Sequence, residues 1–282
     1  MSITIVTVTY NSSKLIKKFF DSILNQKYPL NKLNIVVVDN NSPDIKSLKP
    51  IVKNYQKKLS IKAIYRKINY GFASSCNLGA RNAKDNILFL NPDTQLNKRS
   101  LLILEKHLVE KSASIIGGKA QNSETGILHR TAFNKVTLRM MLFEFSNLGK
   151  VFKVNSKFYV NQENVFSDLE VGGVGGGYML IDRSSFIKLR GFDEKFFMYL
   201  EDVDICMRAR ASNLRVVYCP HSIISHVGGA SSNNKHRILH SAWYNSREYY
   251  ASKYFYFPIS IILIAMYKIE RLLLIIRDKI IR

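Results

Sequence analysis

Residues 3–26 read ITIVTVTYNSSKLIKKFFDSILNQ, and this stretch decides the fold class. Its first eight residues are a nearly continuous β-branched run, which is typical of a strand covered on both faces. A polar capping sequence follows, and then apolar side chains at helical spacing predict a helix. A buried strand that leads directly into an amphipathic helix is the basic unit of an α/β fold.

The same alternation continues to about residue 120. The segments LNIVVVD (33–39), SIKAIYR (60–66) and NILFLN (86–91) predict further strands, separated by helical stretches, one of them starting at Gly71. Alternation of this kind predicts a mostly parallel central sheet flanked by helices. The glycine-rich segment 171–182 predicts a later strand preceded by a close backbone approach or a tight hairpin.

The composition favours an anionic partner. The chain has 282 residues, and 42 Lys+Arg against 21 Asp+Glu give a formal net charge of +21. Such a balance suits a nucleotide, a phosphorylated lipid, an anionic membrane or nucleic acid. The three cysteines show no CxxC spacing, so the sequence predicts neither a disulfide framework nor a zinc site and fits a reducing cytosol. Without an N-terminal basic segment and cleavage site, we expect the domain to begin in the cytoplasm.

Polar residues follow several predicted strands, at the edge where open parallel sheets bind ligands. They are Thr9–Asn11, Asp39–Asn41 and Asn91–Asp93. The carboxylate of Asp39 could accept a hydrogen bond from a pyrimidine imide or a ribose hydroxyl, or it could cap the turn in DNNSPD. The first strand is followed by no glycine-rich loop, and GxxxxGK[ST] is absent. These absences argue against a dinucleotide site of the Rossmann type and against a P-loop.

Asp93 and His226 are candidate metal ligands. Asp93 follows a proline at a strand end, where a carboxylate could bind Mg²⁺ or Mn²⁺ bridging a diphosphate; an ordinary Pro-Asp turn is the alternative. His226 ends another predicted strand and could complete the same site. A single histidine is, however, more often structural than a ligand.

Carboxylates are concentrated in FFMYLEDVDICMRAR (196–210), where a helix is predicted to start. Asp204 and Arg208 are spaced for an i,i+4 ion pair, so Asp204 is expected to be structural. Glu201 and Asp202 have no basic residue four positions on. The helix dipole favours acids in this first turn, but two adjacent carboxylates behind an aromatic run are also placed like a general base and its neighbour.

Together these motifs resemble family-2 glycosyltransferases of the rhamnosyltransferase-like subgroup, over residues 3–232. The segments that carry the resemblance are VTVTYNS, VVVDNNS, NYGFASSCNLGAR, FLNPDT, GGGYMLIDRSSFIKLRGFDEKFFMYLEDVDICMRA and ISHVGGAS. The resemblance implies a GT-A fold and an inverting transfer of a sugar from a nucleotide donor to a hydroxyl group. The metal motif of the family, DxD, reads Asn91-Pro92-Asp93 here, so one carboxylate of the pair is replaced.

The resemblance also implies roles for individual residues. Asp202 would be the general base with Glu201 beside it, and Asp93 with His226 would hold Mg²⁺ or Mn²⁺. The favoured donor is dTDP-L-rhamnose, with a UDP-sugar as the alternative. The acceptor would be a lipid-linked or cell-surface glycan. The residues implied in nucleotide-sugar binding are Thr9, Asp39, Asn41, Asn69, Gly71, Asn77, Asn91 and Asp93.

The sequence predicts a catalytic domain over residues 1–232 and a helical segment over residues 233–282. Residues 257–276 are apolar, but Lys268, Glu270 and Arg271 interrupt them, at a cost of about 2.5–3.5 kcal/mol each at a bilayer centre, which argues against a spanning helix. The segment suits a helix on an anionic cytoplasmic leaflet, which predicts a peripheral location on the inner face of the plasma membrane. Packing on the catalytic domain or on a second copy in a homodimer is the alternative.

Two other classes of function compete with an enzyme. The net charge could indicate a nucleic-acid-binding protein, but the basic residues are scattered and no recognised binding module is present, so we expect no nucleic acid partner. A sugar-nucleotide-binding subunit without activity would bind the donor without turnover.

Overall fold

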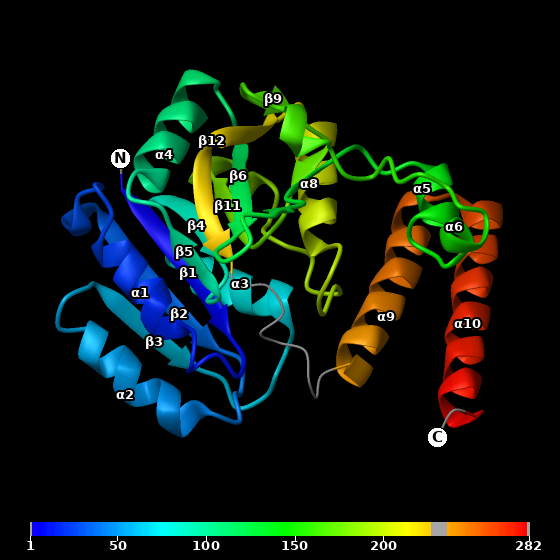
Figure 1. Cartoon of the computed structure of the whole chain (residues 1–282), viewed down its shortest axis with the longest axis horizontal. Coiled ribbons are helices and arrows are strands. Elements are labelled where there is room, and N and C mark those ends of the chain that lie inside the picture. Colours follow the sequence, from blue (N-terminus) through cyan, green and yellow to red (C-terminus); the bar gives the residue numbers. More distant parts are fainter. Residues whose placement is uncertain (1, 227–235, 281–282) are drawn as a thin grey trace.

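The computed structural model describes residues 2–226 and 236–280, and a ten-stranded sheet forms its centre (Figure 1). The strands are β1 (Ile3–Thr9), β2 (Leu33–Asp39), β3 (Ile61–Tyr65), β4 (Asn86–Leu90), β5 (Thr94–Leu96), β6 (Ile115–Asn122), β7 (Leu128–His129), β8 (Ala132–Phe133), β9 (Leu169–Glu170), β10 (Gly173–Val174), β11 (Tyr178–Ile181) and β12 (Val216–His226). The helices are α1 (Ile16–Leu24), α2 (Ile45–Tyr55), α3 (Phe72–Ala80), α4 (Ser100–Glu110), α5 (Leu138–Phe143), α6 (Leu148–Val151), α7 (Arg183–Lys188), α8 (Glu201–Ala211), α9 (His236–Tyr254) and α10 (Phe257–Ile280).

The strand order along the sheet is β3-β2-β1-β4-β11-β6-β12-β5, with β7 beside β6 and β9 beside β12. Strands β1 to β4 are parallel neighbours, as predicted. Beyond β4 the prediction of a mostly parallel sheet needs correction, because β11 is antiparallel to both β4 and β6. Tyr178 at the start of β11 pairs with Leu90 at the end of β4, so the chain enters β11 at the edge where β4 ends and runs in the opposite direction.

Two hydrophobic cores cover the two faces of the sheet. Along β4, Ile87 and Phe89 belong to one core, whereas Leu88 and Leu90 belong to the other, as the two-residue period of a strand requires. Helices α1, α2 and α4 pack on the second face; α3, α7 and α8 pack on the first. Helix α1 starts without the side-chain cap that the sequence predicted; instead the carbonyl of Ser12 accepts from the first backbone N–H groups.

The C-terminal segment forms a helical hairpin, α9 and α10, beneath α5 and α6 (Figure 1). Leu263 and Tyr267 of α10 are fully buried, and the Tyr267 hydroxyl donates to the carbonyl of Met141 at 2.7 Å. The hairpin therefore packs on the rest of the chain and shares its first core. Within the described ranges, none of the helices is long and apolar enough to span a membrane. The predicted boundary at residues 232 and 233 lies outside the described residues.

Candidate active site

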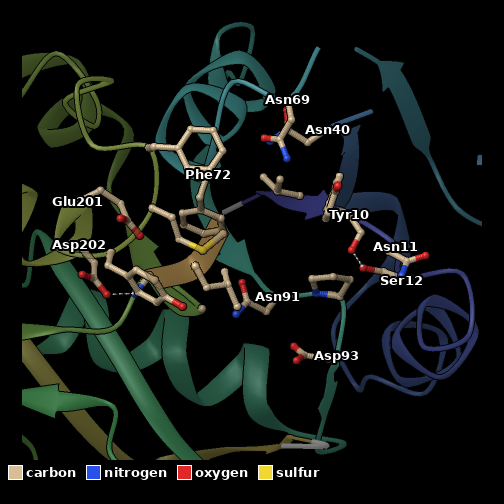
Figure 2. A pocket seen from close by; sticks show the side chains of 18 of the residues that line it. Tyr10, Asn11, Ser12, Asn40, Asn69, Phe72, Asn91, Asp93, Glu201 and Asp202 are labelled. Atoms are coloured by element: carbon tan, nitrogen blue, oxygen red, sulfur yellow. Dashed lines mark hydrogen bonds between the residues drawn. The ribbon is translucent and has the colours of Figure 1, made fainter. Parts of the chain in front are cut away.

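A cavity of about 370 Å³ lies at the carboxyl ends of β1, β2 and β4, where the sequence predicted a ligand site (Figure 2). Tyr10, Asn11 and Ser12 line one side of it and Glu201 and Asp202 the other. The remaining lining residues are Val8, Leu15, Asn40, Asn69, Phe72, Asn91, Pro92, Asp93, Gly176, Gly177, Phe197, Met198, Tyr199 and Leu239.

Thr9 and Asp39 lie beneath this cavity and do not line it. The Thr9 hydroxyl donates to Oδ2 of Asp39 at 3.0 Å, and the backbone N–H of Ser42 donates to Oδ1 at 3.0 Å. The Ser42 hydroxyl also donates to Asp39, whose side chain is 1% exposed. Both carboxylate oxygens thus have partners within the protein. Asn41, with a positive φ of 62°, is exposed and also lies outside the lining.

Asn40 organises the cavity, although the sequence analysis gave it no separate role. Its side-chain N–H groups donate to Oδ1 of Asn69 at 2.7 Å and to the carbonyl of Gly71 at 3.0 Å. Gly71 has φ +87°, and a Cβ there would lie 2.2 Å from the carbonyl oxygen of Phe197. Only glycine therefore fits the point where β2, α3 and the loop before α8 meet. The signal present in the sequence was the pair of asparagines that directly follows Asp39, of which Asn40 is the first.

Asp93 and His226 are brought together, as predicted. His226 pairs with Thr94 across β12 and β5, which puts its Nε2 atom 3.0 Å from Oδ2 of Asp93. That hydrogen bond raises the pKa of His226. The other oxygen, Oδ1 of Asp93, is buried and has no hydrogen-bond partner in residues 2–226 and 236–280. An orphaned carboxylate oxygen beside an imidazole nitrogen fits a divalent cation.

Asn77 does not enter the cavity. Its amide nitrogen donates to the carbonyl of Phe192 at 2.9 Å and to Glu194 at 3.0 Å, while its oxygen accepts from the backbone N–H of Phe192. Asn77 thus fixes the loop that follows α7. Asn69 and Asn91 do line the cavity. A Cβ at Gly177 would lie 2.7 Å from the side-chain nitrogen of Asn91, so the glycine leaves room for that amide.

Helix α8 presents the two adjacent carboxylates through an unusual turn. Tyr199 and Leu200 before it both have positive φ, 71° and 66°, which is rare for large side chains. Asp202 accepts from the backbone N–H of Gly176 at 3.0 Å and of Val203 at 2.8 Å. Glu201 is 5% exposed, and its Oε2 has no hydrogen-bond partner in the part of the chain that the structure describes.

Burial and the proximity of the two carboxylates give Glu201 and Asp202 different protonation states. Burial raises the pKa of Glu201 well above its usual value, and the nearby charge of Asp202 raises it further. Burial also raises the pKa of Asp202, but its two backbone N–H donors oppose that effect. We therefore assign the shared proton to Glu201 and the negative charge to Asp202. Asp204, by contrast, forms the predicted structural pair with Arg208 at 2.8 Å.

A second cavity, of about 320 Å³, shares part of its lining with the first. Tyr199, Glu201 and Asp202 line both cavities, so the two cavities meet at these side chains. Helix α9 contributes Leu239 to the first cavity and Trp243 to the second. No motif in the sequence had indicated that the C-terminal segment takes part in the site. The second cavity is lined further by Arg130, Thr131, Phe133, Glu144, Phe145, Ser156, Phe158, Tyr159, Gly175, Leu200 and Val203.

Known proteins share this sequence pattern. The sequence profile described as glycosyl transferase family 2 matches residues 4–190, and one described as the N-terminal domain of galactosyltransferase matches residues 156–229. Rhamnosyltransferase WbbL of Escherichia coli (strain K12) is 28% identical over 201 residues, 65% of this chain and 74% of that protein. The N-acetylglucosaminyl-diphospho-decaprenol L-rhamnosyltransferase of Mycobacterium tuberculosis (strain H37Rv) is 40% identical over 60 residues, 21% of this chain and 20% of that protein.

Solved structures share the fold. The mannosyltransferase PcManGT from Pyrobaculum calidifontis, in complex with GDP-Man and Mn²⁺, has a TM-score of 0.60 at 17% identity and covers 94% of this chain and 68% of that one. S. aureus TarS 1-349 in complex with UDP has a TM-score of 0.57 at 21% identity and covers 79% of this chain and 59% of that one. The fold is GT-A. With two thirds of its length matched by the family profile, this chain belongs to glycosyltransferase family 2 and is a glycosyltransferase.

Proposed function

We propose that this enzyme transfers a sugar, with inversion, from a nucleotide donor in the first cavity to a hydroxyl group of an acceptor in the second. The observation that carries the proposal is the position of Asp202, which lines both cavities. A general base must contact the acceptor hydroxyl at the point where the hydroxyl oxygen meets the donor carbon. A carboxylate at the boundary of the two cavities meets that requirement.

The proposed reaction is a single displacement. As the hydroxyl oxygen of the acceptor forms a bond to the anomeric carbon, Asp202 takes the proton of that hydroxyl. The bond from that carbon to the diphosphate oxygen breaks on the opposite face, so the configuration inverts and a nucleoside diphosphate leaves. Because Glu201 retains its own proton, no second negative charge lies beside Asp202. The N–H groups of Gly176 and Val203 keep the Asp202 carboxylate oriented.

Negative charge develops on the departing diphosphate and must be neutralised. Asp93 and His226 would hold Mg²⁺ or Mn²⁺, which when bound supplies positive charge to the diphosphate oxygens. The amide of Asn91 lies in the same lining and can donate to a phosphate or sugar oxygen. The Mn²⁺ in the PcManGT complex supports this assignment.

The pyrimidine side of the donor is proposed to lie near Asn40 and Asn69, above the buried Thr9–Asp39 pair. Because both oxygens of Asp39 already accept hydrogen bonds, a direct contact with the base would require one of these bonds to be exchanged. Asn41 and Gly71 contribute through the backbone around this end of the cavity. Asn77 acts at a distance, through the loop that it fixes.

For the sugar, we propose L-rhamnose from dTDP-L-rhamnose, because two similar proteins carry rhamnosyltransferase names. A UDP-sugar is the second candidate, supported by the TarS complex with UDP. For the acceptor we propose a lipid-linked glycan, as the name of the Mycobacterium tuberculosis protein describes for that enzyme.

A lipid-linked acceptor agrees with an exposed apolar surface on α10, which we call the α10 face. Basic residues Lys268 and Arg277 flank it, which suits an anionic membrane surface. We propose that the enzyme binds the inner face of the plasma membrane through it. The residues of the α10 face are Phe257, Ile261, Ile262, Ile269, Leu272, Leu273, Ile275 and Ile276.

The deciding experiment incubates the purified chain with dTDP-L-rhamnose or UDP-N-acetylglucosamine, Mn²⁺, and an N-acetylglucosaminyl-diphospho-polyprenol acceptor. We expect rhamnosylated lipid and dTDP as products, detected by mass spectrometry. If sugar is transferred from the UDP-sugar and not from dTDP-L-rhamnose, the donor is the second candidate. Binding of a nucleotide-sugar without turnover of any donor and acceptor in a panel would overturn the enzymatic proposal in favour of a binding subunit.

A further inference from the structure

Three metal-ligating side chains converge on β12, away from the active site. They are His107 of α4, Asp168 just before β9, and Cys219 of β12. The candidate ligand atoms of these residues all lie within 4.8 Å of one another. Cys219 precedes His226 by seven positions on the same strand, which corresponds to about 20 Å. This group is therefore separate from the Asp93–His226 pair.

Strand pairing fixes two of these side chains next to each other. β9 is antiparallel to β12, and its register joins Leu169 to Tyr218 and Glu170 to Val217. Asp168 directly precedes β9 and Cys219 directly follows Tyr218, so the ends of this pairing agree with the proximity of their side chains. Helix α4 packs on β12 and carries His107 to the same place. The register of β12 against β6 shifts between Cys219 and Ile223, so the strand is irregular at this point.

The carboxylate of Asp168 has one satisfied and one unsatisfied oxygen. Oδ2 lies 2.6 Å from Nδ1 of His107. The Asp168 side chain is only 4% exposed, and its Oδ1 atom is buried without a hydrogen-bond partner in the described ranges. A buried carboxylate oxygen without a partner costs free energy. A cation in the group would remove that cost.

The donor set selects the kind of cation. A thiolate, an imidazole and a carboxylate suit Zn²⁺, whereas Mg²⁺ and Mn²⁺ prefer oxygen ligands. We infer that His107, Asp168 and Cys219 form a binding site for one Zn²⁺ ion. His221, an exposed residue, lies near this group, with its ring centre 5.7 Å from that of His107. Zinc binding replaces the His107–Asp168 hydrogen bond and displaces the thiol proton of Cys219.

Spacing rules could not find this site, and the sequence analysis indeed predicted no zinc site. Its ligands come from three separate segments, so no short motif exists. Without an ion the thiol is protonated, because burial, together with the charge of Asp168, raises the pKa of Cys219 to about 12. The site would join α4, β12 and the segment before β9, and its zinc would contribute to stability by binding only the folded state.

The test uses the full chain, treated with a chelator and then titrated with Co²⁺ and Zn²⁺. We expect one equivalent of Co²⁺ to give a sulfur-to-cobalt charge-transfer band in the near ultraviolet, and Zn²⁺ to remove it. Cys219→Ala should abolish the band and lower the zinc affinity by about 100-fold, since loss of outer-sphere partners alone costs about 10–100-fold. Cys76→Ala, a change at another buried cysteine, is the matched control and should keep the band.

A second readout keeps the test decisive if Cys219→Ala folds poorly. Zn²⁺ should raise the Tm of the parent and of Asp93→Asn/His226→Gln, but not that of His107→Gln or Asp168→Asn. Failure to bind a stoichiometric zinc ion, or a cobalt spectrum that persists in Cys219→Ala, would overturn the inference and leave an ordinary His–Asp hydrogen bond. Neither outcome depends on the proposed transferase reaction.

Discussion

The Nε2 atom of His226 lies 3.0 Å from Oδ2 of Asp93, although 133 positions separate the two residues in the chain. The antiparallel pairing of β5 with β12 creates this proximity. Oδ1 of Asp93 has no hydrogen-bond partner within the described ranges and is therefore available to the proposed cation.

Asp93→Asn and His226→Gln should each weaken the binding of the nucleoside diphosphate in the presence of Mn²⁺ by at least about tenfold, because loss of a metal ligand costs at least as much as loss of its supporting contacts. Without Mn²⁺ the variants should bind like the parent. Calorimetric titration with dTDP and with UDP measures both conditions. His240→Gln, at an exposed histidine of α9, is the control. An unchanged effect of Mn²⁺ in both variants would exclude a shared site.

Asp202→Asn should lower kcat by about 100-fold or more, because the amide keeps the shape of the carboxylate but cannot take a proton. Donor affinity should stay within a few-fold of the parent. Steady-state kinetics with the acceptor, together with donor titration, separate the two quantities. Asp85→Asn, at the opposite edge of the sheet, should leave kcat unchanged. Near-parental turnover in Asp202→Asn would remove it as the base.

Glu201→Gln should stabilise the protein increasingly as pH rises. The folded state raises the pKa of Glu201 above its model-compound value of 4.5, so it holds a proton that the unfolded chain has released. Stability of the parent therefore falls as pH rises from about that value through the raised pKa, and Gln lacks this loss. Across pH 4–8, the Tm of the parent and of Glu201→Gln should be similar at the acid end. Above it, the Tm of the variant should exceed that of the parent by an amount that grows with pH. A difference in Tm that is constant with pH would contradict the assigned proton.

Arg247 and Glu270 join α9 to α10 inside the protein. The Arg247 side chain is 1% exposed, lies 3.4 Å from Glu270, and stacks near Tyr244 and Tyr267. Glu270→Gln should lower the free energy of unfolding by about 3 kcal/mol, the lower end for breaking a buried ion pair. Arg247→Met combined with Glu270→Leu should recover most of that loss. Urea unfolding measures all variants, and a double variant less stable than both single variants would contradict this account.

Substitution on the α10 face tests the membrane proposal without removing the hairpin. Leu272→Glu/Leu273→Glu should reduce co-sedimentation with anionic vesicles, since each change removes apolar contact and adds repulsion. Ile127→Glu/Ile187→Glu, at two exposed apolar residues elsewhere, should bind like the parent. Neutral vesicles isolate the apolar contribution. Equal sedimentation of all three proteins would remove the α10 face as the contact surface.

The sequence predicted the strand framework well, because β1, β2 and β4 are rich in β-branched and apolar residues, which is typical of doubly covered strands. It also predicted that Asp93 and His226 meet, from their positions at strand ends. It could not predict the antiparallel β11, whose direction depends on how the long connection returns. Nor could it place Trp243 in the second cavity, since that contact depends on how α9 packs on the loop before α8.

Asn77, by contrast, does not line the first cavity. Its place in a motif made it a donor-binding candidate, but a helix presents its side chains in all directions, and this one faces the loop after α7. Asn40 faces the cavity instead and was concealed within a polar run. The motifs therefore predicted which region of the chain forms the site, but they did not predict in which direction each side chain points.

Two cavities that meet at Asp202 also constrain the kinetics. With the donor in the first cavity and the acceptor in the second, as proposed, no product has to leave before the second substrate binds, and initial-rate plots should intersect as in a sequential mechanism. The same arrangement lets water reach Asp202 from the second cavity when the acceptor is absent. Slow hydrolysis of the donor would then be a built-in side reaction, suppressed when the acceptor fills the space beside Trp243.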